Sequence, residues 1–420
     1  MLAAPSPVAY RRRLTQAELN MIMDAHERYV SGRPGGKRAT LRFVDFSSLD
    51  FSRRNLSDAD LSASVFDGAR MAGTRLDRAN LFGSDLRQAD LRGASLVRAD
   101  LRGACLRGAN LSRADLTDAD FREGQVTLPD RKAGLASVQH EARVGMIDSA
   151  ILRGATLNGS RLDGASAFAA DFTDCSMRGA KLAGANLKDA NLGGAMMEDA
   201  EVAGANLENA NFEGAVLTGV DVSRARTLGA RFGGALTGSS DAAKARAPQL
   251  RAAIDAHEAW RRTGGREGAP ARLEREDLRP LAGRLKGAKL TAAHLQGCCL
   301  VGLDLSGAEL QGANLEAADL RGAALRGADL RGARLSGANL TKADLRSALL
   351  SGLPLGPERV APATLTSACL RYVQAQGADF TAAVLDQADL GGGDFTDATM
   401  TGVSLRATDI VGAMGLVQRR

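Results

Sequence analysis

Large apolar residues recur at every fifth position along most of this 420-residue chain. The first series covers residues 41–126, the second 147–237 and the third 285–410, with few weak members. A period of five fits neither an α-helix, which repeats every 3.6 residues, nor a flat strand, which repeats every two. It indicates a chain that turns a corner after each short extended segment.

The positions around each large residue repeat as well. Ala commonly stands two positions before it, Asp or Asn one position before it, and Gly two positions after it, as in residues 310–315. Residues two apart in an extended segment point to the same side, so Ala and Leu would fill an interior together. Asp, Asn and Gly would serve the corners through local hydrogen bonds and tolerance of positive φ. Four segments then predict a square coil of about twenty residues that stacks on the next coil.

Residues 310–315 and 325–330 match the repeat of the pentapeptide-repeat family position by position, and the chain resembles this family over most of its length. The resemblance implies an all-β solenoid, a right-handed quadrilateral β-helix. It implies little about function.

Two interruptions break the repeats. Between the first two series the phase shifts by one residue, so we interpret residues 127–146 as an inserted loop or short helix. Pro354, Pro357 and Pro362 fall inside the third series but leave its phase intact, which predicts a distorted coil. Residues 411–420 form a C-terminal tail, which is apolar as far as Val417.

A short motif occurs twice, because Asp24-Ala25-His26-Glu27 is repeated as Asp255-Ala256-His257-Glu258. We therefore expect two copies of one plan, a helix followed by a β-helix. The helices fall in residues 1–40, which also hold a basic arm at Arg11-Arg12-Arg13, and in residues 238–284, a second helical cap or linker.

Both helices have end signals. Thr15 and Glu18 fit a capping box, Gly32 fits a helix stop, and Pro248 suits the first turn of the second helix. A β-helix end exposes backbone groups and interior Leu, and solenoids need capping elements there. We favour short α-helical caps over partner-binding helices.

Two histidine–aromatic pairs, His26 with Tyr29 and His257 with Trp260, recur in the two copies. They are candidates for a ligand or metal contact, or for an interaction surface. The alternative, which we favour, is an imidazole that packs beside an aromatic ring one helical turn away. We expect no metal site, because no other histidine stands at ligand spacing.

Enzyme function is not expected. The chain has no phosphate loop, nucleophile elbow or zinc-protease motif, and nearly every Asp sits at a corner position. The five cysteines occupy repeat positions without a metal or redox spacing, which predicts no cofactor and suits a reducing compartment.

The net charge of +5 is concentrated outside the repeats. Residues 1–40 carry seven basic and three acidic side chains, whereas residues 41–126 carry thirteen of each. Some pentapeptide-repeat proteins imitate duplex DNA and bind DNA gyrase, a role that needs strongly acidic faces. Near-neutral repeats therefore disfavour a topoisomerase-protection protein, which stays the alternative, and we expect no nucleic-acid partner.

These observations predict a non-enzymatic scaffold that binds a protein partner. No apolar run is long enough to span a membrane and no secretory signal is visible, so we expect a cytoplasmic protein. The apolar tail would either cap the last coil or pair two chains. A homo-oligomer with end-to-end or C-terminal contacts is therefore one of two alternatives that the sequence leaves open.

Overall fold

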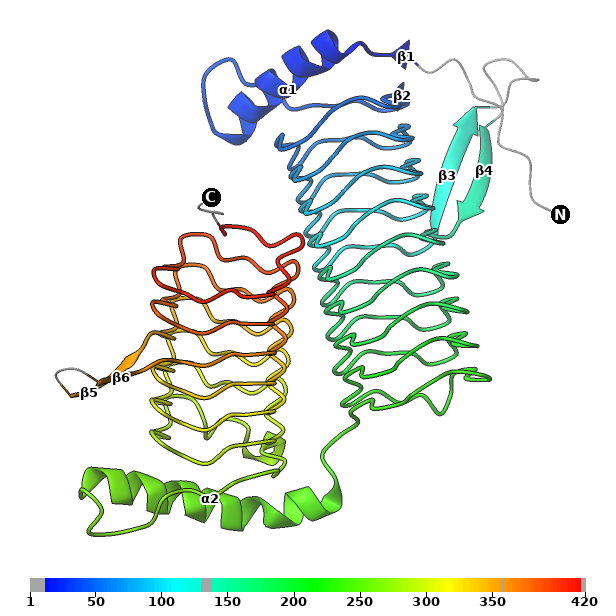
Figure 1. Cartoon of the computed structure of the whole chain (residues 1–420). Coiled ribbons are helices and arrows are strands. Elements are labelled where there is room, and N and C mark those ends of the chain that lie inside the picture. Colours follow the sequence, from blue (N-terminus) through cyan, green and yellow to red (C-terminus); the bar gives the residue numbers. More distant parts are fainter. Residues whose placement is uncertain (1–11, 130–137, 357–358, 417–420) are drawn as a thin grey trace. The chain divides into compact units, whose positions relative to one another are not determined.

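The chain forms two compact units, residues 1–238 (unit 1) and 239–420 (unit 2), each of which is described by itself (Figure 1). The structure, a computed structural model, describes residues 12–129, 138–356 and 359–416. Each unit consists of a helix followed by a stack of coils.

Backbone hydrogen bonds between residues twenty apart hold the coils together. Isolated parallel bridges recur every five residues, as between Asn80 and Asp100. At this bridge the N–H of Leu81 donates to the carbonyl of Asp100 at 2.9 Å, and the N–H of Asp100 donates to the carbonyl of Ala79 at 3.0 Å. The chain is therefore a β-helix-type solenoid, although its named strands are short and pair only in twos.

The repeated Leu and Ala residues form the core of both units. Leu81 and Leu101 are fully buried, and Ala79 and Ala99 lie beside them with at most 1% of their surface exposed. A buried Leu contributes about 1.5–3 kcal/mol, so stability accumulates coil by coil. The predicted interior is confirmed.

The corners explain the Gly of the repeat. At most corners the third residue of a four-residue turn has a positive φ, as at Arg78 (56°) and Gly103 (65°), and the fourth residue donates its N–H to the carbonyl of the first. This is the geometry in which Gly costs least.

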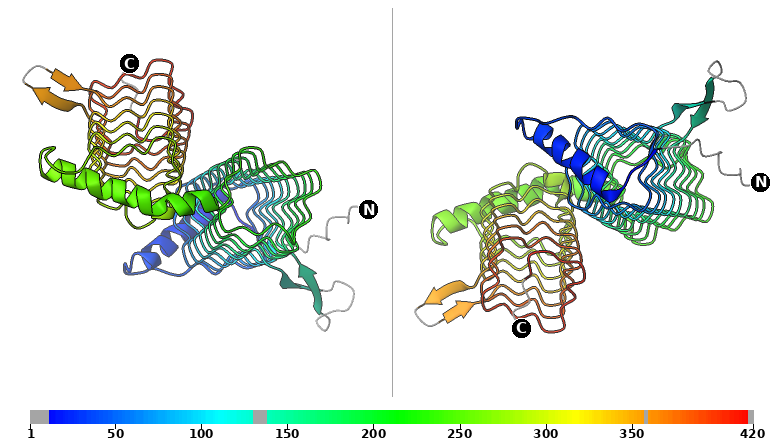
Figure 2. Two further views of the ribbon diagram at one scale, coloured as in Figure 1. Left: turned by 90° about the horizontal axis from the view of Figure 1, so that it is seen from below. Right: turned by 90° about the horizontal axis from the view of Figure 1, so that it is seen from above.

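Unit 1 begins with β1 (Arg12–Arg13), which pairs in parallel with β2 (Val44–Asp45) on the first coil. Helix α1 (Gln16–Val30) follows and lies across the first coil (Figure 2, right). Two residues of the expected basic arm thus belong to a strand, while Arg11 lies outside the described residues.

The end signals of α1 are confirmed. The side chain of Thr15 accepts the N–H of Glu18, whose carboxylate accepts the N–H of Thr15, so the predicted capping box is present. The helix ends at Ser31 and Gly32, where φ is 68°.

A hairpin replaces the loop or short helix expected over residues 127–146. Strands β3 (Gly124–Pro129) and β4 (Val138–Arg143) pair antiparallel. The stack resumes beyond the hairpin, because Cys105 bridges to Met146 and not to Gln125, where a regular coil would end. The last member of the first apolar series, Val126, therefore belongs to strand β3 of the hairpin.

Unit 2 begins with helix α2 (Asp241–Arg262), which is longer than expected. Its N-cap is Ser240, so Pro248 lies inside the helix and not in its first turn, contrary to our prediction.

The coils of unit 2 start before residue 285, within the segment expected to be a cap or linker. Leu273 and Leu278 are buried in the core, and the short 3₁₀ helix η2 (Arg279–Leu281) is part of the first coil. Asp277 bridges to Cys299 and not to Gly297, so this coil is two residues longer than a regular one. The two extra residues shift the phase of the five-residue repeat. The apolar pattern that starts at residue 285 therefore did not include this coil.

A second hairpin replaces the predicted distorted coil at the prolines. Strands β5 (Leu353–Gly356) and β6 (Arg359–Ala361) pair antiparallel, and Arg334 bridges to Thr364 and not to Pro354. The segment that leaves the stack thus has the length of two full repeats. The phase survives for this reason, although Leu355 and Val360 are 56% and 59% exposed.

Glycines at the preceding corners make room for the bases of both hairpins. A Cβ on Gly103 would lie 3.2 Å from the carbonyl oxygen of Arg143 at the base of β4. A Cβ on Gly332 would lie 2.7 Å from the Cβ of Leu353 at the base of β5.

We expect Gly332→Asn to displace hairpin β5–β6 and Gly337→Asn to leave it in place. Both glycines have positive φ (63° and 68°), which Asn tolerates, but a Cβ at Gly337 would meet nothing within 4 Å. The clash at Gly332 should cost about 1–3 kcal/mol. Limited trypsin digestion at Arg359 measures the effect; equal cleavage rates in the two variants would contradict it.

Candidate functional site

The junction between α1 and the first coil uses the Asp-Ala-His-Glu motif of unit 1. The guanidinium of Arg54 pairs with Asp24 and, at 2.8 Å, with Glu27. The carbonyl of Ala25 accepts the N–H of Lys37 at 2.9 Å, where the chain returns from the helix to the coil. Ion pairs and a backbone hydrogen bond thus fasten the helix from both sides of the histidine.

His26 lies between helix and coil with none of its surface exposed. Its Nδ1 accepts the N–H of Ala39 at 3.0 Å, and its Nε2 lies 3.0 Å from the carbonyl oxygen of Ser57. The imidazole is therefore neutral and carries its proton on Nε2. Burial lowers the pKa of His26, although the hydrogen bond to Ser57 opposes this shift.

The second motif makes the corresponding ion pairs and Nδ1 hydrogen bond in unit 2, whereas the Nε2 of its histidine is buried without a hydrogen-bond partner. Arg284 pairs with Asp255 at 2.6 Å and with Glu258 at 2.9 Å. His257 is fully buried, and its Nδ1 accepts the N–H of Ala271 at 3.0 Å. The repeated sequence motif is thus a repeated helix-to-coil joint.

Both aromatic partners stack on their histidines. The rings of His26 and Tyr29 are 6.0 Å apart at 25°, and those of His257 and Trp260 are 5.5 Å apart at 28°. Tyr29 is 46% exposed, so its outer side faces solvent. The interaction role of these four residues stays a prediction, and the two pairs belong to separate units.

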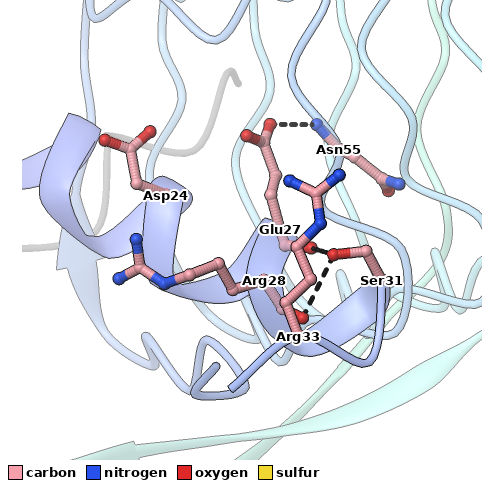
Figure 3. A pocket seen from close by; sticks show the side chains of 6 residues that line it. All are labelled: Asp24, Glu27, Arg28, Ser31, Arg33 and Asn55. Atoms are coloured by element: carbon pink, nitrogen blue, oxygen red, sulfur yellow. Dashed lines mark hydrogen bonds between the residues drawn. The ribbon is translucent and has the colours of Figure 1, made fainter. Parts of the chain in front are cut away.

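A shallow hollow of about 500 Å³ lies beside the α1 joint (Figure 3). Its polar groups largely bond to one another, because the carboxylate of Glu27 accepts the N–H of Asn55 at 3.0 Å and the hydroxyl of Ser31 donates to the carbonyl of Glu27 at 2.7 Å. It is too open to enclose a small substrate and exclude water. The other residues that line it are Asp24, Arg28 and Arg33.

A family model of pentapeptide repeats matches the chain in eight copies, which together cover more than half of it. The chain belongs to the pentapeptide-repeat family. The matched residues are 55–93, 94–127, 150–194, 168–201, 197–226, 288–323, 313–352 and 378–413.

Solved structures of other pentapeptide-repeat proteins are similar to this one. HetL from the cyanobacterium Nostoc sp. strain PCC 7120 is 22% identical, with 93% of this chain and 94% of HetL covered and a TM-score of 0.15. Rfr23 from the cyanobacterium Cyanothece 51142 is 25% identical over 33% of this chain and 90% of Rfr23, with a TM-score of 0.22. QnrB1, a plasmid-mediated fluoroquinolone resistance protein, is 15% identical over 51% of this chain and 95% of QnrB1, with a TM-score of 0.22. No curated protein matches the chain.

The outer surface of the pentapeptide coils carries a feature that our sequence reasoning missed. Where Asp precedes the interior residue and Arg follows it, the two side chains pair, as in Asp90 and Arg92 at 2.6 Å. The same carboxylate accepts the backbone N–H of Arg92, so the pair also closes the corner. The spacing of two between Asp and Arg was the available signal. The other pairs are Asp85–Arg87, Asp100–Arg102, Asp120–Arg122, Asp277–Arg279, Asp319–Arg321, Asp329–Arg331 and Asp344–Arg346.

The pairing favours the ionised form of the Asp90 carboxylate. Hydrogen bonds from Arg92 lower the pKa of Asp90, against the opposing effect of burial. A general acid at neutral pH needs a raised pKa instead. The Asp90 carboxylate is therefore suited to hold the corner and not to act as a general acid.

The Cys298 thiol is unsuited to nucleophilic chemistry. Cys175 and Cys298 are buried in the core, and burial raises the pKa of Cys298 to about 12. A thiol attacks as its thiolate, which this environment disfavours. Among the described residues, no group of three or more His, Cys, Asp or Glu side chains is placed to hold a metal ion.

Proposed function

We propose that this pentapeptide-repeat protein is a non-enzymatic scaffold that binds a protein partner on the faces of its coils. In this proposal each unit is a right-handed quadrilateral β-helix, and α1 and α2 cap the two first coils. The four bridges in each turn of twenty residues support four faces, and the joints at Arg54 and Arg284 support the capping role.

The observation that carries the proposal is the paired, regular outer surface. The Asp–Arg pairs hold both charges at fixed positions on the coils, which gives rigid faces with alternating charge and little net charge. Rigid repeat surfaces suit protein recognition, because little side-chain entropy is lost on binding. A polyanion would need unpaired basic side chains, and a DNA mimic would need unpaired carboxylates.

A column that carries the native protein should retain a specific partner. Removal of two arginine charges from one unit should weaken the binding of this partner at least about tenfold. The matched variants are Arg87→Gln with Arg92→Gln in unit 1, and Arg331→Gln with Arg346→Gln in unit 2. Binding of the purified partner to each variant is measured by calorimetry. A partner that binds both variants as tightly as the native chain, or failure to retain any partner, would contradict the proposal.

The topoisomerase-protection alternative has its own readout. If the protein inhibits DNA supercoiling by gyrase at micromolar concentration, the topoisomerase-protection function would be favoured over a general scaffold function. The surface pairing gives no reason to expect such inhibition.

We also propose that the last coil of unit 2 pairs with a second copy of the chain. Leu405, Val411 and Met414 are 40%, 78% and 45% exposed there, because no further coil covers them among the described residues. Light scattering over a range of concentrations tests for the dimer, and a truncation after Ser404 should lower the fraction of dimer.

The five cysteines form no disulfide, which supports a location in a reducing compartment such as the cytoplasm. No helix among the described residues is long and apolar enough to cross a membrane.

A further inference from the structure

Each helix is fastened to its first coil through a ring nitrogen that must stay unprotonated. In both units the Nδ1 of a buried histidine accepts a backbone N–H, from Ala39 to His26 and from Ala271 to His257, at 3.0 Å in each case. A protonated Nδ1 would be a donor facing a donor, on a side chain with none of its surface exposed to solvent. The hydrogen bond therefore exists only while the imidazole is neutral.

We propose that His26 and His257 are acid-sensitive latches that hold α1 and α2 on the coils at neutral pH and release them on protonation. The proposal goes beyond the scaffold function and does not depend on which partner binds. It rests on the same joint built twice, from one motif, with the histidine at the centre of both.

The charged groups around each imidazole do not cancel the effect of burial. Asp58 and Glu27 favour protonation of His26, whereas Arg38 opposes it. For His257, Glu258 favours protonation and Arg261 opposes it, both from its own helix. The coil side presents the N–H of Ala271 and the carbonyl of Thr291, neither of which titrates.

Burial therefore lowers the pKa of both histidines below the ordinary value of 6.5. The unfolded or released imidazole binds its proton first as the pH falls. The stability contributed by the neutral ring is thus fully present above pH 6.5 and is lost progressively below it.

Release would uncover the first coil of each unit. In unit 1 the residues Phe46, Phe51 and Leu56 lie in the core cluster that also contains Leu19 and Met23 of α1. Removal of α1 would expose apolar surface together with unpaired backbone groups of the coil edge, a surface prone to pair with another edge. At acid pH the uncovered end of the coil stack would therefore be prone to associate with the edge of another chain.

The single tryptophan reports on the latch of unit 2, since Trp260 stacks on His257. Between pH 8 and pH 5 we expect the emission of the full chain to shift to longer wavelength. Amide exchange of α2, corrected for the intrinsic rate, should accelerate by up to about tenfold per pH unit for each proton taken up. Exchange of α1 in the same samples tests His26.

The deciding variant is His257→Asn, because the side-chain oxygen of Asn can accept the N–H of Ala271 without titrating. It should remove the pH dependence of α2 and leave that of α1. The matched control is His294→Asn, since His294 has 39% of its side chain exposed on the coil surface, and it should keep both responses. Unchanged exchange of α2 in the native chain at pH 5, or an acid response that survives His257→Asn, would overturn the proposal.

If His257→Asn does not fold, the reporter can be moved. Tyr29→Trp with Trp260→Phe places the fluorophore beside His26 and leaves both histidines in place. An emission that does not change between pH 8 and pH 5 in this variant would contradict the latch of unit 1.

Discussion

Leu325→Arg should unfold the coils of unit 2 and leave unit 1 folded. Leu325 is fully buried, and the residues one coil away on either side, Leu305 and Leu345, are buried as well. A guanidinium at this position would be a buried charge packed among the apolar side chains of the core. The loss should exceed about 4 kcal/mol, in the range reached only by a few mechanisms.

The damage should spread along one stack, because each coil is stabilised by its two neighbours. Calorimetry of the full chain should show that the transition of unit 2 is lost or greatly lowered, while that of residues 1–238 remains. The control is Leu325→Met, which preserves volume and should cost less than about 1.5 kcal/mol. An unchanged melting temperature and circular dichroism in Leu325→Arg would contradict the assignment of this row to the core.

The second large effect is expected from Gly268→Ala, which should detach the end of α2 from the segment that returns to the coil. A Cβ on Gly268 would lie 2.9 Å from the backbone nitrogen of Trp260 and still closer to the carbonyl oxygen of Ala256. Both atoms belong to helix backbone, which cannot rotate away as a side chain can. The segment must therefore move, and the N–H of Ala269 would lose its acceptor, the carbonyl of Ala256.

Gly264→Ala is the matched control for Gly268→Ala. Both residues have a positive φ (63° and 75°), so Ala costs about 1–2 kcal/mol at either position through backbone conformation alone. A Cβ on Gly264 meets nothing within 4 Å, so only Gly268→Ala should add a further loss of about 1–3 kcal/mol from overpacking. Thermal unfolding followed by Trp260 fluorescence measures both. Equal destabilisation would show that the close approach is not tight.

The sequence predicted the coil well because each five-residue step meets the same requirements. One buried Leu, one small residue and one corner position are needed at every step, so local errors are averaged out over many repeats. The same reasoning located α1, because the capping box of Thr15 and Glu18 acts within four residues.

Insertions are poorly predicted by a periodic pattern. An insertion of two whole repeats preserves a period of five, so Leu355 and Val360 resembled interior residues although they lie in a hairpin. Two extra residues shift it, so Leu273 and Leu278 were assigned to a linker although they lie in the core. Bridge spacing, which only the structure shows, distinguishes these cases.

The joint between helix and coil could be predicted only in part. The repeated motif was visible, but the partners of His26 are backbone groups of Ala39 and Ser57, which carry no side-chain signal. Arg54 and Arg284 were also missed as partners of the motif, since each lies more than twenty residues away from it along the chain.

The two hairpins show that the coils continue in the same way after insertions of different lengths. After the longer insertion Cys105 bridges to Met146, and after the shorter one Arg334 bridges to Thr364, with the usual coils resuming in both cases. A foreign peptide could thus be grafted at these corners and displayed while the core beneath it keeps its register. These two corners are therefore suitable insertion sites for peptides of different lengths.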